Sequence, residues 1–154
     1  MNSRDFSAAP LLDAARIERI IRSGLPIAAQ SDFSVERVEP GIAELRFGYQ
    51  DWMIRPGGSV AGPIMMMATD TAMYAVILAH TDGEEMALTS DLTFHFLGRA
   101  APGELRVTAR LLKLGRRLAV CDVETRDATG KLVLHASGTY ARPLGNIPDS
   151  ASNN

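Results

Sequence analysis

The chain has 154 residues, a size typical of a single domain with a substantial core. Its 16 Lys and Arg residues and 18 Asp and Glu residues give a net charge of −2, which indicates neither a nucleic-acid-binding surface nor an acidic tail. The single cysteine, Cys121, excludes an intrachain disulfide and is typical of a reducing compartment. Residues 1–9 contain no apolar secretory leader, so we expect a cytoplasmic protein that forms one domain over residues 1–154.

The first third of the chain predicts one helix and two short strands. Apolar residues recur at helical spacing over residues 10–23, with charged residues between them, and Gly24 ends the pattern. We expect this amphipathic helix to cover one edge of the core. Residues 33–38 and 42–47 predict strands on either side of a Pro40-Gly41 turn. Residues 50–56 predict a loop.

The apolar stretch from Gly57 to His80 is the most informative part of the sequence. Pro63 suits a first helical turn, and residues 64–79 contain neither Gly nor Pro. A helix over residues 59–79 is apolar on nearly every face, so it should be buried. The one carboxylate inside it, Asp70, needs a polar partner, such as Thr71 or a neighbouring strand, or a function. We expect no membrane span, because a central Asp costs about 2.5 to 3.5 kcal/mol in a bilayer.

Four further strands are predicted at about residues 87–97, 105–111, 119–126 and 132–140. Their short links predict an antiparallel sheet, and the apolar face of that sheet must cover the central helix. We therefore predict an α+β fold in which an antiparallel sheet wraps around one long central helix, with an additional N-terminal helix. The core is expected at residues 33–143, followed by a polar tail at 144–154. Because the sheet covers only about half of the helix, we also expect a homodimer, with a dimer of dimers as an extension.

Five sequence segments occur in an order that is typical of one family. Gly57-Gly58 is followed by Ala68-Thr69-Asp70-Thr71-Ala72, and later by Leu92-Thr93-Phe94-His95-Phe96-Leu97-Gly98-Arg99-Ala100. Residues 114–120 and 135–140 complete the set. Together these segments resemble the hotdog-fold acyl-CoA thioesterases of the phenylacetyl-CoA thioesterase (PaaI) type.

This resemblance implies the hydrolysis of an acyl-CoA thioester to a free acid and CoA. In that family a Gly-Gly backbone polarises the thioester carbonyl and a helix carboxylate acts as general base or nucleophile, roles that fall here on Gly58 and Asp70. Asp70 lies 12 positions beyond Gly58, or ~18 Å along one helix, so the two groups are expected to meet across a dimer interface. We expect neither a metal nor a cofactor, because CoA is part of the substrate and the three histidines lack metal-ligand spacing.

Two positions depart from the family pattern. Pro56 replaces the family's His, and the usual Asn six residues earlier falls on Gln50, which keeps an amide and is a further catalytic candidate. The missing imidazole leaves an alternative open, in which the chain is a non-catalytic module that binds acyl-CoA as a sensor or carrier. On the Arg116-Arg117 turn, the two cations either bind CoA phosphates or are simply solvated. Candidates for substrate contact are Gly57, Thr71, Thr89, Ser90, Arg116 and Arg117.

Overall fold

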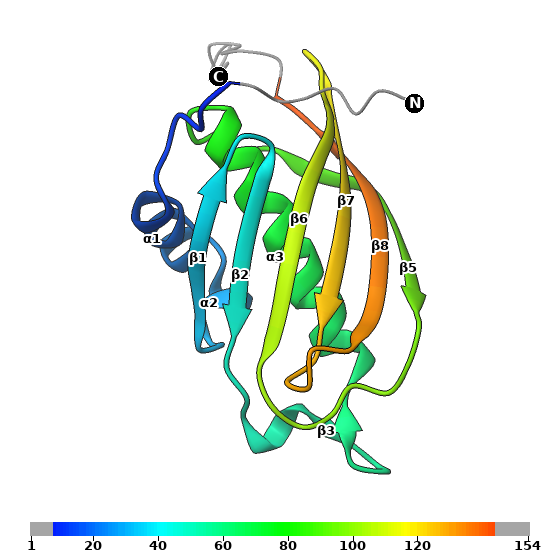
Figure 1. Ribbon diagram of the computed structural model, residues 1–154. Coiled ribbons are helices and arrows are strands. Elements are labelled where there is room, and N and C mark those ends of the chain that lie inside the picture. Colours follow the sequence, from blue (N-terminus) through cyan, green and yellow to red (C-terminus); the bar gives the residue numbers. More distant parts are fainter. Residues whose placement is uncertain (1–7, 144–154) are drawn as a thin grey trace, which may run out of the picture.

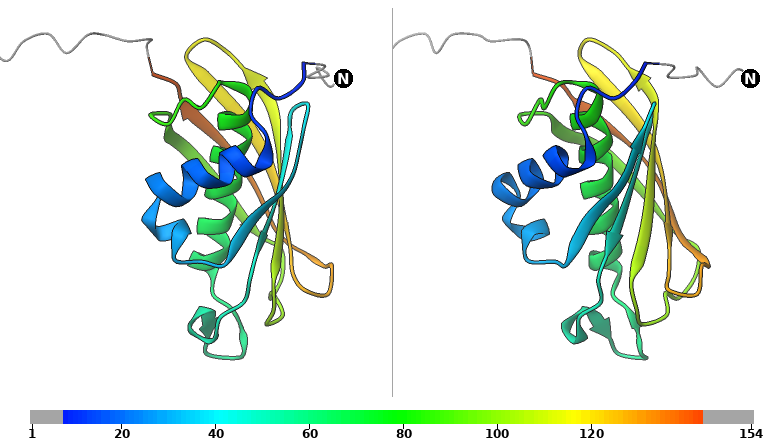
Figure 2. Two further views of the ribbon diagram at one scale, coloured as in Figure 1. Left: turned by 90° about the vertical axis from the view of Figure 1, so that its left-hand side faces the viewer. Right: turned by 60° about the vertical axis from the view of Figure 1, so that its left-hand side comes forward.

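The computed structural model describes residues 8–143, which fold into one large antiparallel sheet with the long helices on a single face (Figure 1). The two side views in Figure 2 show α1 (Ala14–Gly24) and α3 (Gly62–His80) on the same side of this sheet, and no helix of residues 8–143 lies on the other side. The predicted tail at residues 144–154 lies outside the described residues. This arrangement of one sheet around one long helix confirms the predicted hotdog fold.

The sheet has six strands in the order β1-β2-β6-β7-β8-β5. Each strand pairs antiparallel with its neighbours, as the short turns predicted. The apolar residues that alternate along the strands face α3, so the core lies between sheet and helix. The strand bounds are β1 (Phe33–Glu39), β2 (Ile42–Phe47), β5 (Leu88–Phe96), β6 (Leu105–Leu114), β7 (Leu118–Arg126) and β8 (Leu132–Ala141).

The central helix begins at Gly62, three residues later than the sequence predicted. The residues before it form a small hairpin of β3 (Ile54–Arg55) and β4 (Ser59–Val60), where the sequence predicted a loop up to residue 56 and the first residues of the helix from residue 59. Gly57 and Gly58 make its turn with φ angles of 93° and 71°, a conformation that glycine adopts without strain. α3 is long and apolar enough to cross a membrane, yet most of it is buried against the sheet as the core helix.

The N-terminal helix begins at Ala14 rather than near Pro10, because the Asp13 side chain caps it by accepting a hydrogen bond from Arg16 N at 2.8 Å. Its buried face carries Ile17, Ile20 and Ile21. A short helix that the sequence did not predict, α2 (Pro26–Ala29), follows it. Both helices pack against α3, so they cover part of the helix surface that the sequence analysis had left for a second subunit.

The two outer strands of the sheet, β1 and β5, differ in how their edges are covered. Along β1, Glu18 of α1 accepts a hydrogen bond from Val35 N at 3.0 Å, and Arg22 donates to the Phe33 carbonyl, so α1 covers the first part of this edge. Along β5 the side chains of Leu88 and Phe96 are 65% and 50% exposed. Exposed apolar residues on an uncovered edge strand are typical of a surface that pairs with another chain.

A β-bulge at Ser90 decides which side chains of β5 face the helix. The register of β5 on β8 shifts between Thr89 and Asp91, so one residue of β5 is left without a partner on β8. Thr89 and Leu92 are three positions apart and would face opposite sides of a regular strand. With the bulge between them, Thr89 contacts Asp70 of α3 and Leu92 packs on the core.

Candidate active site

Asp70 lies half-buried near the middle of α3, and its carboxylate is held at one oxygen. The Tyr140 hydroxyl donates to Asp70 Oδ1 at 2.6 Å, and the Thr89 hydroxyl donates to the same oxygen at 3.0 Å. Thr89 on β5 and Tyr140 on β8 are directly paired in the sheet, so both donors come from one place. No donor within residues 8–143 contacts Oδ2. The carboxylate is therefore fixed in position while one oxygen stays available to water or substrate.

Tyr140 was not predicted as a site residue. Burial and the neighbouring Asp70 carboxylate both raise the pKa of Tyr140, so its hydroxyl keeps the proton that it donates. The sequence analysis had no role for it. The residue type could have identified it. A buried tyrosine hydroxyl on the core face of a strand needs a polar partner, and Asp70 is one.

A cavity of about 210 Å³ adjoins the Asp70 carboxylate. The rings of Tyr74 and Tyr140 stack in its wall with centroids 6.4 Å apart. The Tyr74 hydroxyl donates to the Glu85 carbonyl at 2.9 Å, which fixes the ring. The other lining residues come from the end of α1 and the start of β5. The full lining is Gly24, Leu25, Asp70, Tyr74, Glu85, Ala87, Leu88, Thr89 and Tyr140.

The start of α3 offers a backbone donor at Gly62 rather than at Gly58. The Gly58 N–H donates to the Arg55 carbonyl at 3.1 Å inside the hairpin turn, so it is already used. The N–H groups of Ile64 and Met65 donate to the Ala61 carbonyl, and the intervening Pro63 has none. Gly62 N–H has no acceptor among the described residues, as expected of a first helical N–H. It adjoins a second cavity, of about 330 Å³.

The revised helix start also changes the spacing between donor and carboxylate. Asp70 lies eight positions beyond Gly62, which corresponds to ~12 Å along α3 in place of the ~18 Å expected from Gly58. One thioester carbonyl cannot reach both groups at that separation. The residue before Gly62 is Ala61. The family's His is therefore missing whether its position is counted from Gly57 or from Gly62.

Of the other predicted substrate contacts on α3, β5 and the hairpin, only one contacts Asp70. Thr89 binds Asp70, whereas the buried Thr71 donates to the Met67 carbonyl at 2.8 Å and is not the partner of Asp70. Ser90 is exposed at the bulge. The Gly57 carbonyl accepts a hydrogen bond from Arg99 Nη2 at 3.0 Å.

The last predicted residues lie away from both cavities. Gln50 precedes the short 3-10 helix η1 (Asp51–Met53), and its Oε1 accepts a hydrogen bond from Trp52 Nε1. Arg116 and Arg117 are exposed on the turn between β6 and β7. None of these three predicted residues lines either cavity described above.

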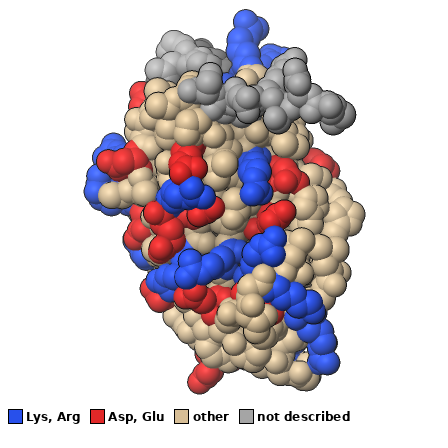
Figure 3. Space-filling model, viewed as in Figure 1, with Lys and Arg blue, Asp and Glu red and all other residues tan. Residues whose placement is uncertain are grey.

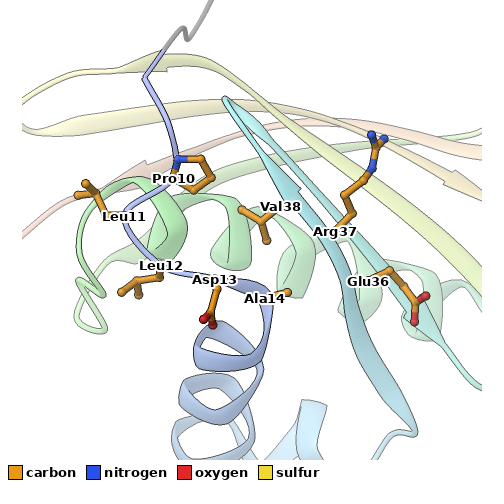
Figure 4. A pocket seen from close by; sticks show the side chains of 8 residues that line it. All are labelled: Pro10, Leu11, Leu12, Asp13, Ala14, Glu36, Arg37 and Val38. Atoms are coloured by element: carbon orange, nitrogen blue, oxygen red, sulfur yellow. The ribbon is translucent and has the colours of Figure 1, made fainter.

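A larger cavity of about 610 Å³ lies between the segment that precedes α1 and strand β1 (Figure 4). Figure 4 shows Asp13 turned toward the first turn of α1, and Glu36 and Arg37 extending away from the other lining side chains. The Asp13 carboxylate is engaged as the helix cap, and none of the predicted catalytic residues lines this cavity. We therefore place the candidate active site at Asp70 and not in this larger cavity.

Comparisons with known proteins agree with this fold. The family model of the thioesterase superfamily matches residues 57–134, which include the turn and second strand of the hairpin, all of α3, the strands β5, β6 and β7, and the first residues of β8. A proposed thioesterase from Silicibacter sp. TM1040 is 33% identical, with a TM-score of 0.78 over 87% of this chain and 94% of that chain. A proposed esterase from Saccharolobus solfataricus is 27% identical over 132 residues, 85% of this chain and 86% of its own length. The PaaI protein of E. coli shares the fold, with a TM-score of 0.76 at 21% identity over 88% of this chain and 96% of its own.

Proposed function

Because the chain belongs to the thioesterase superfamily, we propose that it hydrolyses acyl-CoA thioesters to a free acid and CoA. The observation that carries this proposal is the Asp70 carboxylate, which is held at Oδ1 by Tyr140 and Thr89 and adjoins a cavity. A carboxylate fixed in this way has one oxygen ready for chemistry without further reorganisation. The cytosol, where CoA esters are available, is the proposed location.

In the proposed reaction, the chemistry of Asp70 takes place at Oδ2, either on a water molecule or directly on the thioester carbon. As a general base it takes a proton from water while the water oxygen bonds to the carbonyl carbon. The carbonyl electrons move to oxygen, and their return expels the CoA thiolate, which is then protonated. As a nucleophile, Asp70 bonds to the carbonyl carbon and the C–S bond breaks to release the CoA thiolate, which leaves a mixed anhydride that water hydrolyses to the free acid and Asp70 in a second step. In both routes the Gly62 N–H is the proposed donor to the developing oxyanion, an interaction worth on the order of 3 kcal/mol.

We propose that Gly62 and Asp70 of different protomers build one site in a homodimer. The Phe96 ring lies 3.4 Å from the Cβ position of Gly62, whereas Thr89, near the other end of β5, binds Asp70. Antiparallel pairing of two β5 edges would set the Phe96 end of one strand beside the Thr89 end of the other. This pairing also covers exposed apolar surface of β5, such as the Leu88 side chain. A further pairing of two such dimers is compatible with the same proposal.

The cavity beside Asp70 suggests the acyl group. Its volume of about 210 Å³ suits a small or aromatic acyl chain rather than a long one. The rings of Tyr74 and Tyr140 offer an aromatic substrate edge and face contacts.

The test is a panel of acyl-CoA esters, assayed with a thiol reagent that detects released CoA. Our proposal predicts turnover that is highest for short or arylacyl groups. An acyl-CoA that binds tightly in calorimetry but is never hydrolysed would instead support the non-catalytic sensor or carrier.

A further inference from the structure

Three cations from distant segments surround the cavity at the start of α3. Arg55 of β3 and Arg99, three residues after β5, line this cavity of about 330 Å³. Lys131, at the turn before β8, lies beside it, because its Nζ is 2.8 Å from the Cβ position of Gly98, another lining residue. The fold therefore gathers positive charge at one place that is not evident from the sequence.

These cations differ from those on the outer face of the sheet. There, Lys and Arg alternate with Asp and Glu (Figure 3), and pairs such as Arg37–Glu44 at 2.6 Å and Arg126–Glu124 at 3.1 Å neutralise each other. Within residues 8–143, no carboxylate lies within 4.0 Å of the charged atoms of Arg55, Arg99 or Lys131. Unneutralised positive charge around a cavity favours an anionic ligand.

The guanidinium of Arg99 is positioned by the hairpin turn. Its Nη2 donates to the Gly57 carbonyl at 3.0 Å and lies 2.5 Å from where a Cβ of Gly57 would be. A side chain at residue 57 would therefore displace the guanidinium. The remaining N–H donors of Arg99 have no acceptor within residues 8–143 and stay available to a ligand.

The rest of the cavity wall is apolar on one side. Val60, Met65, Phe96 and Leu97 line it, and Phe96 and Leu97 are 50% and 54% exposed. An amphipathic arm that ends in phosphate matches this combination of apolar wall and cationic rim. Gly62, the proposed oxyanion donor, lines the same cavity and would mark the thioester end of such an arm.

We propose that this cavity binds the leaving group of the substrate, with the pantetheine arm along Phe96 and Leu97 and the CoA phosphates at Arg55, Arg99 and Lys131. The inference rests on the proposed thioester hydrolysis and adds the part of the substrate that is recognised. CoA fits better than a phosphopantetheine carried by a protein, because the cations surround a cavity instead of spreading over a docking face.

The test compares one acyl group carried on CoA and on pantetheine, which lacks every phosphate. In the double variant Arg99→Ala/Lys131→Ala we expect the ratio of kcat/KM for the CoA ester over the pantetheine ester to fall by at least about 30-fold, since each charge-assisted phosphate contact accounts for about tenfold. The loss should appear in KM. If the double variant does not fold, Lys131→Ala alone gives the same test with about a tenfold loss, because its side chain has no hydrogen-bond partner within residues 8–143.

The control is Arg116→Ala/Arg117→Ala, which removes the same charge from the other basic turn and should change the ratio by less than about twofold. The inference would be overturned by an equal loss on both esters or by a larger effect in the control. It would also be overturned if the protein preferred the same acyl group on an acyl carrier protein and Arg99→Ala/Lys131→Ala abolished that preference. If the protein hydrolyses no thioester at all, that result contradicts the proposed function but not the proposed CoA site. Calorimetry with CoA then decides the inference, which requires the double variant to weaken binding by at least about 30-fold.

Discussion

The Tyr140 hydroxyl and the Asp70 carboxylate meet at 2.6 Å although 70 positions separate them in the chain. The contact joins β8 of the sheet to the middle of the helix that the sheet covers. It fixes the carboxylate through Oδ1, and Thr89 adds a second donor at 3.0 Å. The proposed chemistry at Oδ2 therefore depends on the sheet as much as on the helix.

The substitution Asp70→Asn should reduce kcat more than tenfold and leave folding and CoA binding intact, because an amide neither accepts a proton from water nor attacks the thioester at neutral pH. Steady-state kinetics and circular dichroism provide the measurement. Asp122→Asn, on the outer face of the sheet, is the matched control. Retention of more than about a tenth of kcat by Asp70→Asn would exclude the carboxylate as base or nucleophile.

Tyr140→Phe removes the shorter of the two hydrogen bonds to Asp70 and keeps the ring. We expect kcat to fall about tenfold, because a hydrogen bond to a charged group is worth about 1.5 to 3 kcal/mol. Tyr74→Phe is the comparison, since the Tyr74 hydroxyl binds the Glu85 carbonyl and not the carboxylate. Equal effects of the two substitutions would show that Tyr140 acts through general packing instead.

Cys121 should be inert toward thiol reagents in the folded protein. It is fully buried, and burial raises its pKa to about 12, so almost no thiolate forms at pH 8. We expect reaction with one thiol per chain only after denaturation. A fast reaction in the native state would contradict the buried position, and it would also add background to a thiol-detected hydrolysis assay.

Asp127 joins two turns of the sheet and should make stability dependent on pH. Burial raises its pKa, but hydrogen bonds from Ala101 N, the Thr129 hydroxyl and backbone, and Lys131 N outweigh burial, so the pKa is lowered. The stabilisation is thus present above the unfolded value of about 3.9 and is lost as the pH falls through the lower folded pKa.

Asp127→Asn should therefore lower the free energy of unfolding by about 2 kcal/mol at pH 7, and by less near pH 3. Urea unfolding at the two pH values measures the difference. An equal loss at both pH values would show that the carboxylate charge does not contribute.

The sequence predicted those parts of the fold that rest on local pattern. Alternation identified the strands, and the uninterrupted apolar run identified α3 with Asp70 inside it. The sequence pattern could not place the start of that helix, because Ser59 and Val60 suit either a helix or a strand. Their pairing with Arg55 and Ile54 decided between the two.

The site was predicted in the same partial way. Thr89 was predicted as a substrate contact, but its contact with Asp70 depends on the bulge at Ser90, which alternation alone does not reveal. Tyr140 was missed because its partner lies 70 positions away. The cavity at the start of α3 needs Arg55, Arg99 and Lys131 together, and only the folded chain brings these three segments to one place.

The shared site is the central claim, and two inactive variants test it. Asp70→Asn removes the carboxylate, and Gly62→Pro removes the proposed donor. Gly62 is the first residue of α3, where proline is well tolerated, and Ala61 before it is extended at φ −68° and ψ 143°, as a residue preceding proline prefers. Gly58→Pro would not serve, because Gly58 has a φ of 71° that proline cannot adopt.

The measurement is the activity of the two variants after they are refolded together. Each homodimer should be inactive. If each site takes Gly62 from one protomer and Asp70 from the other, mixed dimers carry one intact site, and random pairing should restore roughly a quarter of wild-type activity. Circular dichroism must show that both variants fold, and tagged chains must show that mixed dimers form. Mixed dimers without any activity would contradict the assignment of Gly62 and Asp70 to one site across the interface.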